Sequence, residues 1–364
     1  MKIVHLCLSA FYIDNYSYQE NMLPKYHVKQ GYDVTVIASL FTFSEEGKGI
    51  YLSKPSEYVN KDGIKVVRLD YERPFYKINR FLRRYHHFST TLEEEKPDII
   101  FSHNVSTADM ATLKSYMVKH PQVILYADNH ADYINSGKNV LSRHILHPII
   151  WRHYATLIEP YVRIFYGVTP MRCRFLTEMY RIPQDKVAFL PMGVDDESIP
   201  NNRLAVRQSV RDELGIPSHA TVIITGGKID HLKNIHVLVK AFTALEIKDL
   251  HLMICGVLTQ EMAYLKDVFD TNENIHYLGW CNAARVINCM VASDIACFPG
   301  THSTLWEQSV GVGLPSIFKR WNDMEHVNVN NNCLFVQGED ADELVSAISL
   351  MTSNYEKYKN TQDI

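Results

Sequence analysis

The residue types best able to do chemistry gather in residues 298–318. A short apolar run ends there, and a polar turn with His302, Ser303 and Thr304 precedes a segment of helical period. The start of a helix presents unpaired backbone N–H groups, which bind phosphate well. Two interpretations of Glu307 stay open. It caps its own helix, as in a capping box with Ser303 or Thr304, or it accepts hydrogen bonds from ribose hydroxyls.

A second stretch, residues 224–242, combines two glycines with two lysines. We expect Gly226 and Gly227 to end a strand, where a missing Cβ lets the backbone approach a ligand. Lys228 and Lys233 follow on the next loop, within reach of one anion, although loop lysines are often only solvated. No Gly-Lys-Ser/Thr closes the stretch and no Gly-x-Gly-x-x-Gly opens it, so neither a P-loop nor a dinucleotide fingerprint is present.

A third group follows a strand end in the N-terminal half, within residues 126–132. Asp128, His130 and Asp132 alternate there, a spacing that suits either a binding site or an ordinary polar loop. A metal site needs a convergent third or fourth ligand, and we expect no metal ion. His103, at another strand end, is a weaker candidate for the same region.

These groups are positioned by apolar runs that alternate with helix-like segments along most of the chain. Strands apolar on both faces and separated by helices indicate a parallel sheet covered on both sides. The clearest strand runs are 3–8, 34–38, 99–102, 123–127, 164–168, 222–225, 252–255 and 295–298. The run 3–8 is better explained as a buried strand than as a signal peptide, because no convincing cleavage site follows it.

The alternation restarts after a polar segment, residues 195–207, which we interpret as a linker. We therefore expect an α/β protein with two Rossmann-like parallel-sheet domains, 1–196 and 197–352, and a polar tail, 353–364. Ligands of such sheets bind at the carboxyl ends of strands. Two facing domains would place the site in the cleft between them.

Composition excludes several classes of protein. The chain has 364 residues, 46% of them hydrophobic, which suits a globular protein of about two domains. The formal net charge of −4 gives no electrostatic case for nucleic acid as a partner. Seven cysteines without a C-x-x-C pair suggest reduced thiols in the cytoplasm. No apolar stretch reaches the roughly 18 residues of a membrane span.

The order of the motifs resembles the retaining glycosyltransferases of glycosyltransferase family four, which have the GT-B fold. Residues 227–234 resemble that family's G-[R/K]-x4-K-G segment, and residues 293–299 resemble its A-D-[VIL]-x3-P-S run. Residues 305–315 match L-L-E-A-M-A-x-G-x-P closely. Residues 277–280 resemble the loop that holds the base, and residues 190–195 the P-N-G-V-D segment that ends the first domain.

The resemblance implies an enzyme that moves a sugar from a nucleotide-diphospho-sugar to a glycan or lipid-linked acceptor, with retention. It points to surface polysaccharide assembly, of capsule or O-antigen, and slightly favours a UDP-sugar over a GDP-sugar. It implies no cofactor. The enzyme would be cytoplasmic. Two basic, aromatic segments, at 85–87 and 143–154, are either solvated helix faces or a surface for weak peripheral contact at the inner face of the cytoplasmic membrane. The sequence determines neither the donor sugar, nor the acceptor, nor the oligomeric state.

The resemblance also assigns roles to residues. The lysines stabilise charge on the departing diphosphate and the histidine faces the donor sugar, so the catalytic groups are Lys228, Lys233 and His130. The donor-binding residues are Gly227, Trp280, His302, Ser303, Thr304 and Glu307. Acceptor or sugar contacts are assigned to Asn15, Tyr16, Asp128 and Asp132.

The chain also departs from the family pattern. The family commonly carries two glutamates as E-x7-E, and Glu307 matches the second, whereas the first falls at Pro299. His302 or Ser303 covers part of that space. Lys228 stands where arginine is usual, so the bidentate fork is lost. Two alternatives stay open: a non-catalytic nucleotide-sugar-binding protein of this fold, and a two-domain nucleotide-dependent oxidoreductase, which the missing glycine fingerprint disfavours.

Overall fold

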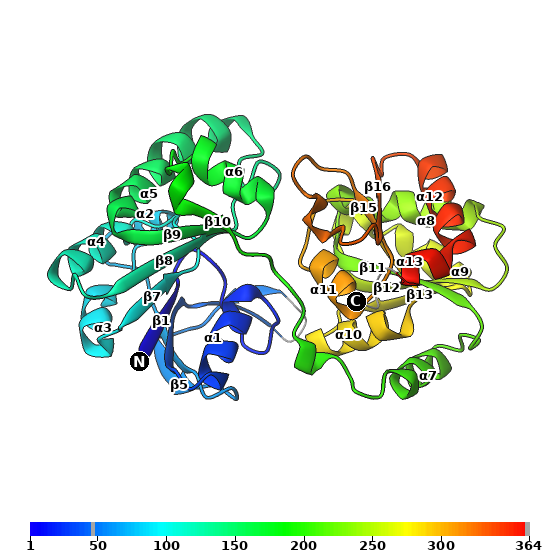
Figure 1. Cartoon of the computed structure of the whole chain (residues 1–364), viewed down its shortest axis with the longest axis horizontal. Coiled ribbons are helices and arrows are strands. Elements are labelled where there is room, and N and C mark those ends of the chain that lie inside the picture. The colour runs from blue at the N-terminus through cyan, green and yellow to red at the C-terminus, as the bar shows by residue number, and fades with distance from the viewer. Residues whose placement is uncertain (45–47, 361–364) are drawn as a thin grey trace. The chain divides into compact units, whose positions relative to one another are not determined.

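The structure is a computed structural model that describes residues 1–44 and 48–360. The chain forms two compact units, Met1–Pro191 and Met192–Ile364. Each unit contains a mainly parallel sheet with helices packed against it (Figure 1). The expectation of two parallel-sheet, Rossmann-like domains is confirmed.

The first unit contains an eight-stranded sheet in the order β10-β9-β8-β7-β1-β2-β6-β5. All neighbouring pairs are parallel except β5–β6. The strands are β1 (Lys2–Cys7), β2 (Asp33–Ser39), β5 (Ser56–Val59), β6 (Lys65–Leu69), β7 (Ile99–Ser102), β8 (Ile124–Asn129), β9 (Val162–Gly167) and β10 (Val187–Phe189). A separate antiparallel pair joins β3 (Phe41–Phe43) to β4 (Gly49–Tyr51).

Helices cover this sheet because its central strands are apolar on both faces. Val4 and Leu6 of β1 belong to one buried cluster, whereas Cys7 belongs to another with Val36 of β2. The helical segments are α1 (Gln19–Lys29), α2 (Tyr76–Leu82), α3 (Phe88–Glu95), α4 (Met110–Lys119), η1 (Ser142–Trp151, a π-helix), α5 (Arg152–Ile158), η2 (Glu159–Tyr161), α6 (Pro170–Glu178) and η3 (Gln184–Lys186).

The second unit contains a six-stranded, all-parallel sheet in the order β13-β12-β11-β14-β15-β16. The strands are β11 (Thr221–Ile229), β12 (Leu250–Leu258), β13 (Ile275–Gly279), β14 (Ile295–Phe298), β15 (Ser316–Lys319) and β16 (Cys333–Val336). The helical segments are η4 (Asp196–Ser198), α7 (Arg203–Glu213), η5 (His231–Lys233), α8 (Ile235–Ala244), η6 (Gln260–Met262), α9 (Leu265–Thr271), α10 (Ala283–Ala292), α11 (Leu305–Val312), η7 (Glu325–Val327), α12 (Ala341–Ser353) and α13 (Tyr355–Asn360).

Alternate residues of β11 face two apolar cores. Ile223 packs in a cluster with Leu238 of α8, and Ile224 packs in a cluster with Trp306 of α11. Burial on both faces produces the near-continuous apolar runs seen in the sequence. The core therefore fixes α8 on one face of the sheet and α11 on the other.

The structure corrects the expected end of β11, which runs past both glycines to Ile229. A Cβ at Gly226 would come within 2.1 Å of the Cys255 carbonyl oxygen, and one at Gly256 within 2.0 Å of the Gly227 carbonyl oxygen. These glycines let β11 and β12 approach each other. Lys228 is consequently a strand residue and not a loop residue.

Residues 76–95 form two helices, α2 and α3, because Arg83 and His87 adopt left-handed backbone conformations between them. Two other segments differ from expectation. Residues 203–207 of the expected linker begin α7, which Asn202 caps by accepting the Ala205 N–H. The expected polar tail includes α13, whose Tyr358 joins a buried cluster; residues 361–364 lie outside the described part.

Candidate active site

The candidate residues follow the carboxyl ends of parallel strands within each unit. In the second unit, η5 follows β11 and the loop 299–304 follows the neighbouring β14. In the first unit, His103 follows β7, and Asp128 lies near the end of the adjacent β8. Ligands of α/β sheets bind at this edge.

Lys233 is joined to the loop after β14 through main-chain atoms. Its Nζ donates to the carbonyl oxygen of Thr301 at 2.7 Å and to that of His302 at 3.3 Å. The contact depends on Gly300, because a Cβ there would lie 2.4 Å from both the Leu232 oxygen and the Lys233 Cα. The structure therefore unites two of the sequence-predicted stretches around one ammonium group.

The Lys233 ammonium is also destabilised by its surroundings. Burial lowers the pKa of Lys233 to about 8, and the Asp230 carboxylate opposes this only in part. A buried cation of this kind gains most from an added anion. Lys233 is accordingly suited to a phosphate group.

Glu307, in the first turn of α11, is a buried carboxylate held by two histidines. Its Oε1 lies 2.8 Å from His302 Nε2 and 2.9 Å from His326 Nε2. A carboxylate can only accept, so both ring nitrogens carry protons. Its Oε2 is buried and has no hydrogen-bond partner within residues 1–44 and 48–360. One acceptor oxygen is thus available to a ligand hydroxyl.

The two histidines keep Glu307 ionised despite its burial. Burial alone would raise the carboxyl pKa, but His302 and then His326 more than offset this, and the pKa falls well below its usual range. Charge-assisted hydrogen bonds of this kind are stronger than neutral ones. Glu307 remains a carboxylate over the pH range in which proteins fold.

The capping interpretation of Glu307 is wrong. Thr304 occupies the N-cap position but makes no side-chain capping bond, and the buried Ser303 Oγ has no partner among the described residues. Glu307 turns to the histidines instead. Sequence reasoning missed His326, because a contact with η7 across 19 residues leaves no local signal.

Three other residues that were expected to bind the donor are less buried than Glu307. Gly227 has φ of +107°, a conformation that favours glycine. Lys228 is exposed on β11, and Trp280, directly after β13, is 40% exposed. All three lie near the carboxyl ends of β11 and β13, two strands that β12 separates.

In the first unit, Asp128 joins two histidines. Its Oδ2 lies 2.7 Å from His103 Nδ1, and its Oδ1 lies 3.3 Å from His130 Nε2. His130 Nε2 also lies 3.8 Å from Glu20 Oε1. Burial lowers the pKa of His130, but Asp128 and Glu20 outweigh it and the pKa rises. His130 is therefore a good candidate for a cation at this strand edge.

A chain of histidines leads from this group into the sheet. His103 Nε2 lies 3.0 Å from His5 Nδ1, and His5 Nε2 lies 2.9 Å from His27 Nδ1. Because Asp128 accepts from His103 Nδ1, neutral rings must donate in sequence from His27 to His5 to His103. Burial lowers the pKa of both His5 and His27, which keeps these rings neutral.

The residues expected to contact the acceptor or the sugar differ from one another in exposure and in hydrogen bonding. Both oxygens of Asp132 are engaged: Oδ2 with Arg172 Nε at 3.0 Å, and Oδ1 with the N–H groups of Ile134 and Asn135. Asn15 is exposed with φ of +65°. The ring of Tyr16 packs near those of Tyr18 and Phe43, with centroids 5.3 and 5.4 Å away.

Two clusters have metal-type side chains with ligand atoms within 4.8 Å of one another. They are His103, Asp128 and His130, and His302, Glu307 and His326. The shortest contact in each, 2.7 Å and 2.8 Å, has the length of a charge-assisted hydrogen bond. His130 joins the first cluster through its 3.3 Å ion-pair contact with Asp128. The expectation of no metal stays a prediction.

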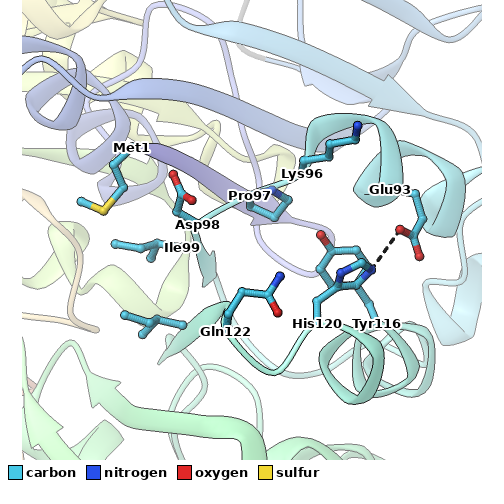
Figure 2. A pocket seen from close by; sticks show the side chains of 10 residues that line it. Met1, Glu93, Lys96, Pro97, Asp98, Ile99, Tyr116, His120 and Gln122 are labelled. Carbon is cyan, nitrogen blue, oxygen red and sulfur yellow. Dashed lines mark hydrogen bonds and ion pairs between the residues drawn. The ribbon is translucent and has the colours of Figure 1, made fainter.

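A hollow of about 550 Å³ lies elsewhere in the first unit (Figure 2). Its lining includes Met1, Ile99 and Ile124, at the amino ends of β1, β7 and β8. His120 and Glu93 form a 3.0 Å contact at its wall. This is the opposite edge of the sheet from His103, so the hollow is not part of the candidate site.

Comparison with solved structures identifies the fold. A glycosyltransferase from Rickettsia africae has 15% identity and a TM-score of 0.68 over 99% of this chain and 93% of its own. Anabaena Alr3699/HepE, in complex with UDP, has 14% identity and a TM-score of 0.66 over 100% and 94%. The lipopolysaccharide-biosynthesis glycosyltransferase WaaG has 16% identity and a TM-score of 0.63 over 99% and 95%. These likenesses show a GT-B fold.

Two family models give the class of enzyme. The model "Glycosyl transferases group 1" matches residues 206–363, and "Glycosyltransferase Family 4" matches residues 22–198. No curated protein sequence matches the chain. The chain belongs to glycosyltransferase family four, and it is an enzyme that transfers a sugar from a nucleotide-sugar. The oxidoreductase alternative is wrong.

Proposed function

We propose that the enzyme transfers a sugar, with retention, from a UDP-sugar to a glycan or lipid-linked acceptor in surface polysaccharide assembly. The observation that carries this proposal is the pairing of Lys233 with the loop that leads into α11. It gathers an ammonium group, a helix N-terminus and the Glu307 carboxylate in one unit. These three groups suit a diphosphate and a ribose.

The proposed roles follow from charge and exposure. Lys233, Lys228 and the N-terminus of α11 would stabilise negative charge that builds on the diphosphate as the sugar leaves. The free Oε2 of Glu307 would accept a ribose hydroxyl, and Trp280 would pack on the base. Ser303 Oγ, which is buried without a partner among the described residues, would donate to a phosphate oxygen.

The first unit would supply His130 to the donor sugar. Its raised pKa supports a positive charge on the ring. Asp128 and Asp132 would hold His130 and its loop in place, since their oxygens already contact protein groups. Asn15 and Tyr16 remain proposed contacts of the acceptor side.

The chemistry needs no protein nucleophile. The acceptor oxygen would attack the anomeric carbon on the face that the diphosphate leaves, and the departing phosphate oxygen would take the acceptor proton. One C–O bond forms as another breaks, and the proton goes to the leaving group. The protein would contribute placement and electrostatic stabilisation.

The choice of UDP is supported by relatives of the same fold. Structures of Anabaena Alr3699/HepE contain UDP and UDP-glucose. A lipid-linked acceptor would place the enzyme at the inner face of the cytoplasmic membrane. No helix in residues 1–44 and 48–360 is long and apolar enough to cross a bilayer.

The test has two stages. Thermal shift with UDP, GDP and ADP should show the largest rise in melting temperature for UDP, because binding to the folded state alone stabilises it. UDP release from a panel of UDP-sugars, with and without glycan acceptors, should then identify transfer. Stabilisation by UDP without transfer to any acceptor would favour a binding protein, and no stabilisation by any nucleotide would overturn the proposal.

A further inference from the structure

Three free cysteines lie together on one face of the sheet in the second unit. Side chains alternate along β12, and Cys255 faces the same apolar cluster as the buried residues of α10. Cys289 of α10 is completely buried in that cluster, and the half-buried Cys281 packs against it. The Cys255 thiol interacts with both of the other thiols.

The pairing of β12 with β13 brings Cys281 next to Cys255. Cys255 is the register partner of Gly279, at a point where the register between the two strands shifts. Gly279 has φ of +64°, a conformation that favours glycine and lets the chain turn after β13. Cys281 follows two residues later, and its Sγ lies 3.7 Å from the Gly279 carbonyl oxygen. The turn therefore directs the Cys281 thiol back toward the end of β12.

Cys281 is the half-buried cysteine that favours the thiolate form. Contact with Cys255 lowers the pKa of Cys281 and the Arg285 guanidinium lowers it further, although burial and Glu213 oppose them. Cys281 also directly precedes Asn282, the N-cap of α10, and a helix N-terminus stabilises a thiolate. Burial instead raises the pKa of four other cysteines, Cys7, Cys173, Cys297 and Cys333. The thiolate is the reactive form of cysteine.

We propose that Cys281 and Cys255 form a reversible disulfide when the protein meets a peroxide, and that this bond displaces Trp280. An accessible cysteine that ionises readily and touches a second thiol has the features of a redox-sensing pair. Cys281 would react with the oxidant, and Cys255 would then resolve the product. Cys289 is completely buried, so it is less accessible than Cys281 to an oxidant in solvent.

The atoms balance in two steps. The Cys281 thiolate attacks one oxygen of hydrogen peroxide, the O–O bond breaks, and the hydroxide that leaves takes a proton from solvent. The Cys255 sulfur then attacks the sulfur of the Cys281 sulfenic acid, the S–O bond breaks, and the departing hydroxide takes the Cys255 proton. Contact with Cys281 is the first cause of the raised pKa of Cys255, and the neutral sulfenic acid removes that charge. Two thiols and one peroxide give one disulfide and two waters.

The disulfide would change the position of Trp280, which lies between Gly279 and Cys281. A disulfide holds its sulfur atoms about 2 Å apart, closer than any two unbonded thiols. Cys281 would therefore move toward β12, and Trp280 would move with it. Trp280 is proposed above to pack on the base, so oxidation would weaken nucleotide binding. This last consequence rests on the proposed function, whereas the disulfide and the movement of Trp280 do not.

The first test needs no nucleotide. The full chain is compared in its reduced form and after treatment with hydrogen peroxide. Mass spectrometry should show the loss of two hydrogens, and peptide mapping without reductant should join the peptides that contain Cys255 and Cys281. Tryptophan fluorescence should change on oxidation of the wild type and stay constant in Trp280→Phe. Dithiothreitol should reverse each change.

Cysteine variants separate the roles of the two thiols. Cys281→Ser should form no disulfide. Cys255→Ala, once circular dichroism shows that it is folded, should stop at the Cys281 sulfenic acid, which dimedone traps. Cys173→Ser is the matched control, because Cys173 is also half-buried but burial raises its pKa. This control should oxidise like the wild type.

The second test is titration with UDP. Oxidation should weaken UDP binding at least about fivefold, the factor expected when stacking of a base on an aromatic ring is lost. Cys281→Ser should bind UDP equally well before and after peroxide. The proposal is overturned if peroxide joins other cysteines or none, if Cys173→Ser prevents the disulfide, or if the disulfide leaves both the fluorescence and the UDP affinity unchanged. Formation of the disulfide, with the fluorescence change, in a protein whose reduced form binds no nucleotide would overturn the proposed function alone.

Discussion

His326 Nε2 lies 2.9 Å from Glu307 Oε1, on the oxygen that His302 also contacts. Two donors on one carboxylate oxygen leave the other oxygen for a ligand. The two donors also offset the free-energy cost of burying the carboxylate charge, which would otherwise destabilise the folded protein. The proposed donor site therefore depends on a histidine outside the recognisable family motifs.

We expect Glu307→Ala to weaken donor binding more than turnover. The ribose hydroxyls are the same in the ground and transition states, so their hydrogen bonds contribute uniform binding. Loss of one charge-assisted hydrogen bond should cost about 1.5–3 kcal/mol in UDP affinity. Calorimetric UDP titration and steady-state kinetics will check this, after circular dichroism confirms folding. Unchanged donor affinity would remove Glu307 from the site.

We expect His326→Asn to make donor binding sensitive to acid. In the wild type the pKa of Glu307 lies below its ordinary value of 4.5, so the carboxylate persists as pH falls from 7 to 5. With one histidine removed, burial should raise that pKa. A pKa raised to one unit above pH 5 would leave about a tenth of the carboxyl ionised there, so the donor should bind about tenfold more weakly at pH 5 than at pH 7. UDP titrations at several pH values measure the effect. The exposed His219→Asn serves as control and should leave the profile flat.

We expect Lys233→Ala to reduce the rate of transfer. Charge on the diphosphate grows as the sugar leaves, so the loss should appear mainly in kcat, by roughly 2–4 kcal/mol. The pKa of Lys233 is about 8 in the free protein, so its charge is present below pH 8 and lost above it. The wild-type kcat/KM should therefore fall above about pH 8. This alkaline decrease of kcat/KM should be absent in Lys233→Ala. Lys240→Ala, on the exposed side of α8, should retain both rate and profile.

We expect Asp128→Asn to lower the pKa of His130. The raised pKa of His130 depends on Asp128 first and Glu20 second among its acidic neighbours. Removing the nearer negative charge leaves burial to favour the neutral ring. NMR titration of labelled histidines should show a drop of about one unit or more. Glu20→Gln, at 3.8 Å rather than 3.3 Å, should produce a smaller drop; an unchanged His130 in Asp128→Asn would contradict the assignment.

We expect Gly226→Ala to destabilise the second unit. The added Cβ would meet the Cys255 carbonyl oxygen, a backbone atom that cannot move without separating β11 from β12. Such overpacking costs roughly 1–3 kcal/mol or more. Gly193→Ala is the matched control, because nothing lies within 4 Å of its added Cβ. Urea unfolding of both variants measures the difference, and equal stabilities would show that the strands are not in close contact.

Much of the architecture could be predicted because buried apolar positions recur along the chain with the period of each helix or strand. Strands covered on both faces give continuous apolar runs, so both sheets were visible in the alternation of residues. Lys233 and Glu307 were found because each lies in a motif next to a strand end or helix start. The limits of β11 were not found, because glycine suits both a strand at close approach and a strand end.

The missed contacts join side chains far apart in the sequence. His5 lies 98 residues from His103 and 22 residues from His27 in the sequence. The local sequence around each histidine does not indicate that the three rings are in contact. The break between α2 and α3 depends on left-handed conformations of Arg83 and His87, which neither residue type signals by itself because non-glycine residues adopt them uncommonly. Only the assembled sheet brings these groups together.

The contact of Lys233 with two carbonyl oxygens has a consequence for how donor preference can change. Carbonyl oxygens are present whatever side chains residues 301 and 302 carry, and the close approach of that loop to the lysine requires Gly300. The Thr301 side chain can therefore be exchanged while the ammonium stays in place. A library randomised at 301, with Gly300, His302 and Ser303 kept, would vary the side chain next to the proposed donor site and leave the charge of Lys233 where it is.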